Sequence, residues 1–121
     1  MNFSLTTQEL GGGSAVIALA GEVDLYTAPE LKAELIRLVE AGASNIVVDL
    51  TDTTFIDSTT LGVLVSGLKR LRPAGGRLAL VVTDKNIRKI FEITGLDRVF
   101  PILEDREAAL VDETVAGAEQ A

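Results

Sequence analysis

The sequence predicts an α/β fold, with a mixed, mostly parallel sheet of four to five strands packed against about four helices. Three short apolar runs, at residues 15–20, 46–50 and 77–82, have the length and composition of buried strands. Segments with apolar residues at helical spacing separate these runs. Strands that alternate with helices along a chain are typical of a parallel sheet with helical crossover connections.

The composition is that of one folded domain, which we place at residues 1–121. The chain has 121 residues, of which 47% are hydrophobic, so it can bury a substantial core. No apolar run approaches the roughly 20 residues that a transmembrane helix needs. The first residues lack the basic start and apolar stretch of a signal peptide, so we expect a cytoplasmic protein.

Missing residue types exclude several kinds of chemistry. The chain contains no Cys and no His, which removes thiol catalysis, thiolate or imidazole metal sites and any Ser-His-Asp triad. The formal net charge of -7 opposes binding to nucleic acid and to anionic membranes. We therefore expect no metal, no cofactor and no catalytic residue, and a domain that works by binding another protein.

The amino-terminal segment predicts a hairpin. Residues 3–7 alternate apolar and polar side chains, as a half-buried edge strand does. The glycines at 11–13 allow the chain to reverse. The run at 15–20 is apolar on both faces, so we expect it inside the sheet and antiparallel to the first strand.

A loop and a helix follow the hairpin. Residues 21–26 are expected to form a loop at the carboxyl end of the second strand. Thr27 and Glu30 have the spacing of a capping box, which predicts a helix start at Thr27, and Gly42 is the expected stop. The predicted buried stripe of this helix consists of Leu31, Leu35, Leu38 and Val39.

The central strand and the next helix enclose a polar segment. The strand is predicted at 46–50, with Asp49 at its end, and a polar loop is expected from there to Asp57. A helix is predicted to start at Ser58 and to run to about Arg72, where a proline and two glycines end it. Its apolar stripe is Leu61, Leu64, Val65, Leu68 and Leu71.

A third buried strand, at 77–82, leads into a short helix. Thr83 or Asp84 is expected to cap this helix, and Gly95 to close it. The side chains expected to face the core are Ile87, Ile90 and Phe91.

The chain is expected to end with a short strand and a helix. The strand is predicted at 98–100, cut off by Pro101, which cannot donate to a ladder. The helix is predicted at 104–115, where an acidic first turn suits the helix dipole. We expect residues 117–121 to fray. The side chains expected on one side of this helix are Leu110, Val111 and Val115.

Two predicted loops leave the carboxyl ends of strands, where open α/β sheets place functional residues. One loop holds Asp24 and the other covers residues 52–58, so we expect them to lie side by side. Ser58 falls at a helix start, where unpaired N–H groups and the helix dipole favour a negative charge. Position alone leaves Ser58 two roles, a simple N-cap or a site that accepts a charged group.

Three motifs narrow this choice. GEVDLYTAPEL at 21–31, IVVDL at 46–50 and IDSTTLGVL at 56–64 occur in this order. Together they strongly resemble the STAS domains, in particular the anti-sigma-factor antagonists of bacteria. The order of elements predicted above also fits the STAS fold from about residue 3 to residue 115.

The resemblance implies a phosphorylation switch at Ser58. In the family, a partner that is both anti-sigma factor and ATP-dependent serine kinase phosphorylates the matching serine, and a separate phosphatase removes the phosphate. The unphosphorylated protein binds this partner and frees the sigma factor, whereas the phosphorylated protein does not bind. The residue that matches Asp24 lies near the serine and supports its phosphorylation.

The residues that flank Ser58 are expected to complete the docking edge. We expect Asp57 to cap the helix and to take a secondary part in contact, with Thr59, Thr60 and Gly62 along the same edge. Thr60 replaces a glycine that is frequent in the family, and Thr59 adds a second candidate acceptor hydroxyl.

Phosphorylation is expected to change the surface more than the fold. A phosphate adds about -1.5 to -2 charges at pH 7, and a helix start stabilises a negative charge by roughly 0.3–1 kcal/mol. A docked partner would have to desolvate that charge beside Asp57, at a cost of several kcal/mol unless a cation meets it. Since about 1.4 kcal/mol is tenfold in affinity, one phosphate is expected to turn binding off.

Other classes of function fit the sequence less well. A phospho-aspartate receiver would use Asp49, but it also needs an acidic pair for Mg²⁺, and the first strands end in Leu10 and Ala20. A non-switching STAS scaffold or transporter-accessory module keeps the fold without using an acceptor serine. A hydrolase would need a histidine to activate Ser58, and the chain has none.

Overall fold

The computed structural model describes residues 3–111 of the chain, so Val115 and the predicted tail at 117–121 lie outside the described residues. The strands are β1 (Ser4–Gly11), β2 (Ser14–Val23), β3 (Asn45–Ile56), β4 (Arg77–Val81) and β5 (Ile102–Leu103). The helices are α1 (Ala28–Glu40), α2 (Ser58–Leu71), α3 (Lys85–Thr94) and α4 (Arg106–Val111), with short 3-10 turns η1 (Arg72–Ala74) and η2 (Leu96–Arg98).

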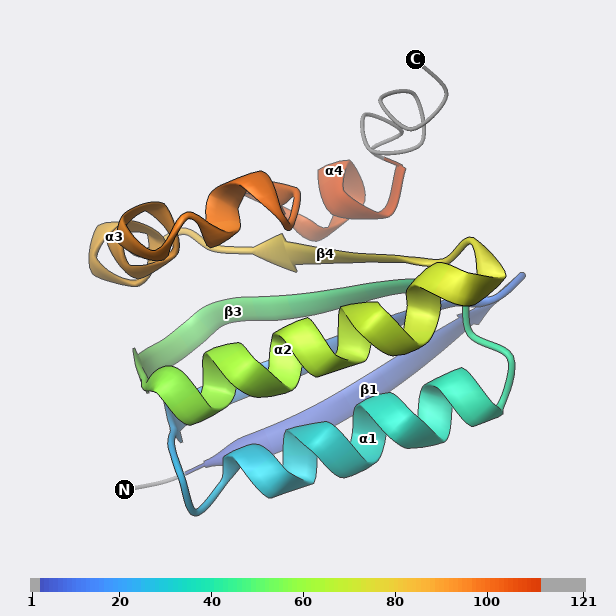
Figure 1. Ribbon diagram of the computed structural model, residues 1–121, viewed down its shortest axis with the longest axis horizontal. Coiled ribbons are helices and arrows are strands. Elements are labelled where there is room, and N and C mark those ends of the chain that lie inside the picture. The colour runs from blue at the N-terminus through green and yellow to red at the C-terminus, as the bar shows by residue number, and fades with distance from the viewer. Residues whose placement is uncertain (1–2, 112–121) are drawn as a thin grey trace.

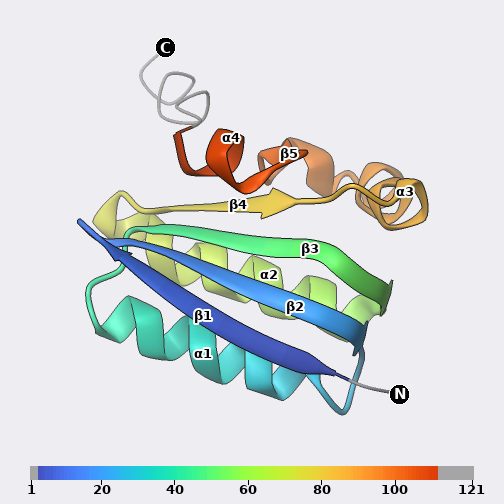
Figure 2. The same cartoon turned by 180° about the vertical axis from the view of Figure 1, so that it is seen from behind.

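The strands form one sheet in the order β1-β2-β3-β4-β5, so each strand lies beside the one that precedes it in the chain (Figures 1 and 2). β1 pairs with β2 in antiparallel orientation, whereas β2 with β3, β3 with β4 and β4 with β5 pair in parallel. This mixed, mostly parallel sheet with helical crossovers confirms the fold class that the sequence predicts.

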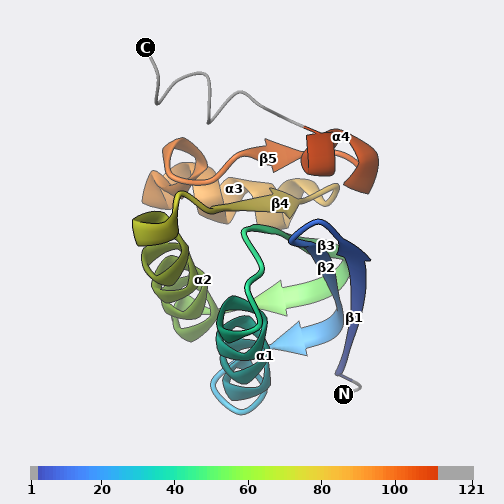
Figure 3. The same ribbon diagram turned by 90° about the vertical axis from the view of Figure 1, so that its right-hand side faces the viewer.

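The two faces of the sheet carry separate apolar layers. α1, α2 and α3 cover one face, and α4 lies against the other (Figure 3). Because successive strand residues point to opposite faces, neighbours in one strand belong to different layers. The larger layer includes Ile17, Val48, Leu80, Leu35, Leu64 and Phe91. The smaller layer consists of Val16, Val47, Ala79, Val81 and Ala109, with Leu103 and Leu110 at its margin.

β3 is longer than predicted, which moves the site to the end of a strand. The polar loop expected after residue 50 is wrong, because the strand continues to Ile56. Thr53 is buried in this extension, and its hydroxyl donates to the Leu19 carbonyl at 3.3 Å. The polar side chains here suggested a loop. The strand forms nevertheless, because β-branched threonines suit an extended backbone as well as valines do. β2 is also longer than predicted, because it pairs with β3 as far as Val23 and Ile56, so the loop expected at 21–26 begins only after residue 23.

Asp49 lies within β3 and does not end it, so its predicted place is also wrong. Its carboxylate is buried and accepts hydrogen bonds from the Thr51 hydroxyl at 2.5 Å and the Arg106 Nε at 2.6 Å. Arg106 is the first residue of α4, so this ion pair joins α4 to the middle of the sheet.

Polar contacts hold most of α4 in place. Arg77 donates to the Ala109 carbonyl at 2.9 Å, and the Asn45 amide donates to the Leu110 carbonyl at 3.2 Å. Ala109 is the buried residue of α4 in the described part of the chain, whereas Val111, expected on the buried side, is 73% exposed. The helix begins at Arg106, two residues later than predicted, because the Asp105 side chain accepts the Ala108 N–H ahead of it.

The ion pair between Asp49 and Arg106 makes part of the stability depend on acid pH. Burial alone would raise the pKa of Asp49, but hydrogen bonds from Thr51 and Arg106 hold this pKa below its ordinary value. The stabilisation is therefore complete above the unfolded-state pKa of about 3.9 and is lost as the pH falls through the lower folded-state pKa. At neutral pH we expect Asp49→Asn to lower the free energy of unfolding by about 1 kcal/mol, since Arg106 is half exposed.

Urea unfolding of both proteins, from about pH 7 down to about pH 3, measures this difference. We expect the gap between wild type and Asp49→Asn to narrow below about pH 4. Glu9→Gln is the control, because Glu9 and its partner Arg37 are both exposed and should contribute no such acid-dependent gap. A gap for Asp49→Asn that stays constant over the whole range would contradict the assignment.

The last strand also differs from the prediction. Residues predicted as a strand at 98–100 begin in the 3-10 turn η2, which Gly95 starts in the left-handed conformation with φ of 76°. The Val99 and Phe100 N–H groups both donate back to the Leu96 carbonyl, which keeps the turn tight. β5 follows Pro101, because a proline without an N–H can precede or open an edge strand but cannot donate within one.

Candidate functional site

The candidate site lies at the carboxyl end of β2 and β3, where α2 begins (Figures 1 and 2). Val23 and Ile56 pair at the ends of the two strands, so the loop after β2 and the start of α2 lie side by side, as expected. Ser58 is the first residue of α2 and is exposed. The acceptor hydroxyl predicted from the sequence is therefore accessible at a helix start.

Asp57 connects the two segments of the site. It is the N-cap of α2, as expected, and its Oδ1 accepts the Thr60 N–H at 3.2 Å. Its other oxygen, Oδ2, accepts the Leu25 N–H at 3.1 Å from the loop after β2. One carboxylate thus caps the helix that carries Ser58 and holds the neighbouring loop against it.

Asp24 orders the loop between β2 and α1. Its Oδ1 accepts the N–H groups of Tyr26 at 2.9 Å and Thr27 at 3.1 Å, a turn in which an Asp side chain replaces a backbone acceptor. The capping box predicted for Thr27 and Glu30 is wrong, because the Thr27 side chain makes no cap hydrogen bond to α1. The Thr27 hydroxyl instead accepts the Asp24 N–H at 2.8 Å and donates to the Glu22 carbonyl at 3.0 Å.

Thr60 is part of the scaffold and not of the docking edge. Its side chain is fully buried, and its hydroxyl donates to the Val23 carbonyl at 2.5 Å. The expectation that Thr60 lines the edge is therefore wrong for its side chain, because a partner cannot reach it. The hydrogen bond ties the first turn of α2 to the last residue of β2, a contact that a glycine at this position could not make.

The other two edge residues have different surroundings. Thr59 is half-buried, next to Ser58 in the first turn. Gly62 is exposed, and a side chain placed there would meet no atom within 4 Å, so Gly62 leaves open space beside the first turn of α2. Close helix packing instead occurs at Gly67, where a Cβ would lie 3.0 Å from the Leu35 Cδ1 of α1. Nothing in the sequence pattern indicates this packing at Gly67, because a single glycine inside a helix adds nothing to the apolar periodicity.

Two large apolar side chains on the loop next to the start of α2 were also missed. Leu25 is 60% exposed and Tyr26 is 84% exposed, both in the loop that Asp24 and Asp57 hold. Their signal in the sequence is an apolar pair directly after Asp24, at a place where a loop is expected to be polar. Singly exposed apolar residues need no explanation, but an adjacent pair at a candidate site does.

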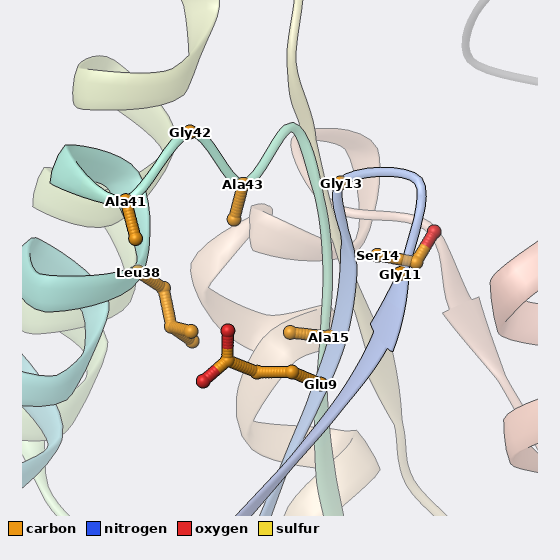
Figure 4. A pocket seen from close by; sticks show the side chains of 9 residues that line it. All are labelled: Glu9, Gly11, Gly13, Ser14, Ala15, Leu38, Ala41, Gly42 and Ala43. Carbon is orange, nitrogen blue, oxygen red and sulfur yellow. The ribbon is translucent and has the colours of Figure 1, made fainter.

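A cavity of about 160 Å³ lies at the opposite end of the sheet, between the β1–β2 turn and the end of α1 (Figure 4). Figure 4 shows the Glu9 carboxylate reaching into it toward Leu38. Glu9 already contacts Arg37 at 3.3 Å, and the remaining walls are mostly glycine and alanine. A single paired carboxylate gives little to orient a ligand, so this cavity is the weaker candidate.

The described residues offer neither a metal-binding cluster nor a membrane-spanning helix. Between residues 3 and 111 there is no group of three or more His, Cys, Asp or Glu side chains placed to hold a metal ion. In the same part of the chain, every helix is too short or too polar to span a bilayer.

Comparison with known proteins agrees with this geometry. The STAS domain family model matches residues 5–109. The anti-sigma-B factor antagonist of Bacillus subtilis is 36% identical over 94 residues, which cover 78% of this chain and 85% of that protein. The anti-sigma-B factor antagonist of Listeria monocytogenes is 38% identical over 103 residues, which cover 84% of this chain and 90% of that protein.

A solved structure supports the same assignment. The crystal structure of an anti-sigma factor antagonist from Mycobacterium paratuberculosis superposes with a TM-score of 0.81 at 27% identity, over 90% of this chain and 92% of that one. The sheet order, the site at the start of α2 and the match over residues 5–109 point to one conclusion. This chain belongs to the STAS domain family.

Proposed function

We propose that this protein is an anti-sigma-factor antagonist controlled by phosphorylation of Ser58. In the unphosphorylated form it binds an anti-sigma factor that is also a serine kinase, and the sigma factor is released. The observation that carries the proposal is the exposed hydroxyl of Ser58 at the first position of α2, beside the capping carboxylate of Asp57. The relatives named anti-sigma-B factor antagonists support the antagonist role.

The surroundings of Ser58 explain how one phosphate ends binding. The start of α2 tolerates added negative charge, so the domain keeps its fold. A partner seated on this edge would have to desolvate a dianion next to Asp57, the N-cap of the same helix. The affinity therefore falls because the surface has changed, while the backbone stays in place.

The partners follow from the same chemistry. The chain offers a hydroxyl acceptor and no histidine to act as a base, so we assign the phosphotransfer step and the bound ATP to the anti-sigma factor. A separate phosphatase restores the free hydroxyl, and the cycle runs in the cytoplasm. Asp24 takes a supporting part by keeping the loop beside Ser58 in one conformation.

The direct test combines the protein with a candidate anti-sigma kinase and ATP, followed by intact mass and peptide mapping. We expect one phosphate, on the peptide that contains Ser58, and none on Ser58→Ala. Thr59→Ala is the matched control. It removes the adjacent hydroxyl but keeps Ser58, so it should still be phosphorylated. Tight binding of the kinase without phosphotransfer would contradict the switch and favour a non-switching scaffold.

A further inference from the structure

The loop between β2 and α1 presents two large apolar side chains to solvent. Leu25 is 60% exposed and Tyr26 is 84% exposed, which leaves most of both side chains uncovered. Removing the apolar surface of Leu and Tyr from water is favourable, and Tyr is among the residues most enriched at the energetic centres of protein interfaces. The pair therefore has the chemistry of an anchor.

The backbone beneath this pair is fixed. The Tyr26 N–H donates to Asp24 Oδ1 at 2.9 Å, and the Leu25 N–H donates to Asp57 Oδ2 at 3.1 Å. The next residues begin α1, where the Ala28 N–H donates to the Asp24 carbonyl at 2.7 Å. A loop that is ordered before binding loses little conformational freedom when a partner docks.

The same residue that holds Leu25 also starts the helix of Ser58. Asp57 uses Oδ2 for the Leu25 N–H and Oδ1 for the Thr60 N–H. One carboxylate therefore links the backbone of the apolar pair directly to the helix start that carries Ser58. A partner that contacts both must match this fixed spacing.

We propose that Leu25 and Tyr26 form an apolar anchor to which the anti-sigma factor binds. Asp57 is a positioning residue that holds this anchor near the helix start that carries Ser58. This inference rests on the proposed function, because it assumes the same partner. Asp24 and Asp57 hold the anchor through the backbone N–H groups of Tyr26 and Leu25. The complementary partner surface is an apolar pocket that packs against Leu25 and Tyr26.

The first experiment measures the affinity of the unphosphorylated protein for its anti-sigma kinase by calorimetry, with Leu25→Ser and Tyr26→Ser as variants. We expect each variant to weaken binding about tenfold or more, as truncation of a central anchor does. Ile93→Ser is the matched control, since Ile93 is 76% exposed on α3 and should leave the affinity unchanged. Unchanged affinity for both Leu25→Ser and Tyr26→Ser would overturn the anchor.

The second experiment tests Asp57 through Asp57→Ser. Serine keeps the N-cap of α2 but cannot reach the Leu25 N–H, so the Leu25 amide should exchange with solvent faster while the urea midpoint stays close to that of wild type. The affinity should fall about tenfold, and Asp57→Ser should add little to that loss in a Tyr26→Ser background. Full additivity of the two substitutions would overturn the positioning role.

The failure of this inference and that of the proposed function are distinguishable. If wild type binds the kinase and is phosphorylated on Ser58 while Tyr26→Ser and Leu25→Ser bind as tightly, the anchor alone is wrong. If wild type neither binds the kinase nor accepts a phosphate, both the proposed function and the proposed anchor are wrong.

Discussion

A Ser58→Glu variant should bind the anti-sigma factor about a hundredfold more weakly than wild type while it unfolds at the same urea concentration or a slightly higher one. The added carboxylate stands at the first position of α2, where the helix dipole favours it by roughly 0.3–1 kcal/mol. In the complex it must be desolvated beside Asp57, and that costs several kcal/mol when no cation meets it. A loss of about 2.7 kcal/mol corresponds to the expected hundredfold.

Two controls separate the position of the charge from the charge itself. Ser58→Ala removes the hydroxyl without adding charge and should bind nearly as wild type does. Gln8→Glu adds one negative charge on the exposed side of β1, away from the start of α2, and should also bind normally. Titration calorimetry with the anti-sigma factor measures all three affinities. If Ser58→Glu and Gln8→Glu bind equally well, a surface charge at α2 is not what turns binding off.

A Phe91→Ala variant should lose about 3–5 kcal/mol of unfolding free energy, the largest stability effect that we expect from a single substitution in this chain. Phe91 is fully buried, and with Ile87 it makes up the buried face of α3. Truncation removes the larger of the two side chains that hold this helix to the sheet. Since small domains have a total stability of about 5–15 kcal/mol, the loss is a large fraction of it.

Equilibrium unfolding in urea, followed by circular dichroism, measures this effect. Ile93→Ala is the matched control, because Ile93 lies on the same helix and is 76% exposed. Its unfolding free energy should change by less than about 0.5 kcal/mol. Equal losses for the two variants would mean that α3 is not held by its buried face.

Periodicity predicted the fold well where burial was the deciding influence. The runs that became β2 and β4 are apolar on both faces, and the stripe of α2 repeats at helical spacing, so each could be recognised without tertiary knowledge. The end of β3 could not, because Thr53 is polar in sequence and buried in the fold. The prediction for the segment after Gly95 failed for another reason. There a left-handed glycine and Pro101 determine the backbone path, and the pattern of apolar side chains does not.

The candidate site was predicted in position but not in detail. The start of α2 and the exposure of Ser58 follow from a helix boundary, which the sequence marks with Asp57. The burial of Thr60 depends on a carbonyl that β2 supplies, 37 residues earlier in the chain. The clamp from Asp57 to Leu25 likewise joins residues 32 positions apart. Contacts of this kind follow from strand register, which the sequence does not state.

The unbroken order of the strands in the sheet bears on how the domain is made. Each new strand pairs with the one synthesised just before it, so no strand has to wait for a later one to find its partner. A chain leaving the ribosome can extend the sheet in a single direction as it lengthens. α4 is the last of the described elements to be synthesised. The face of the sheet that carries Val47 and Ala79 therefore stays exposed to water until α4 packs against it.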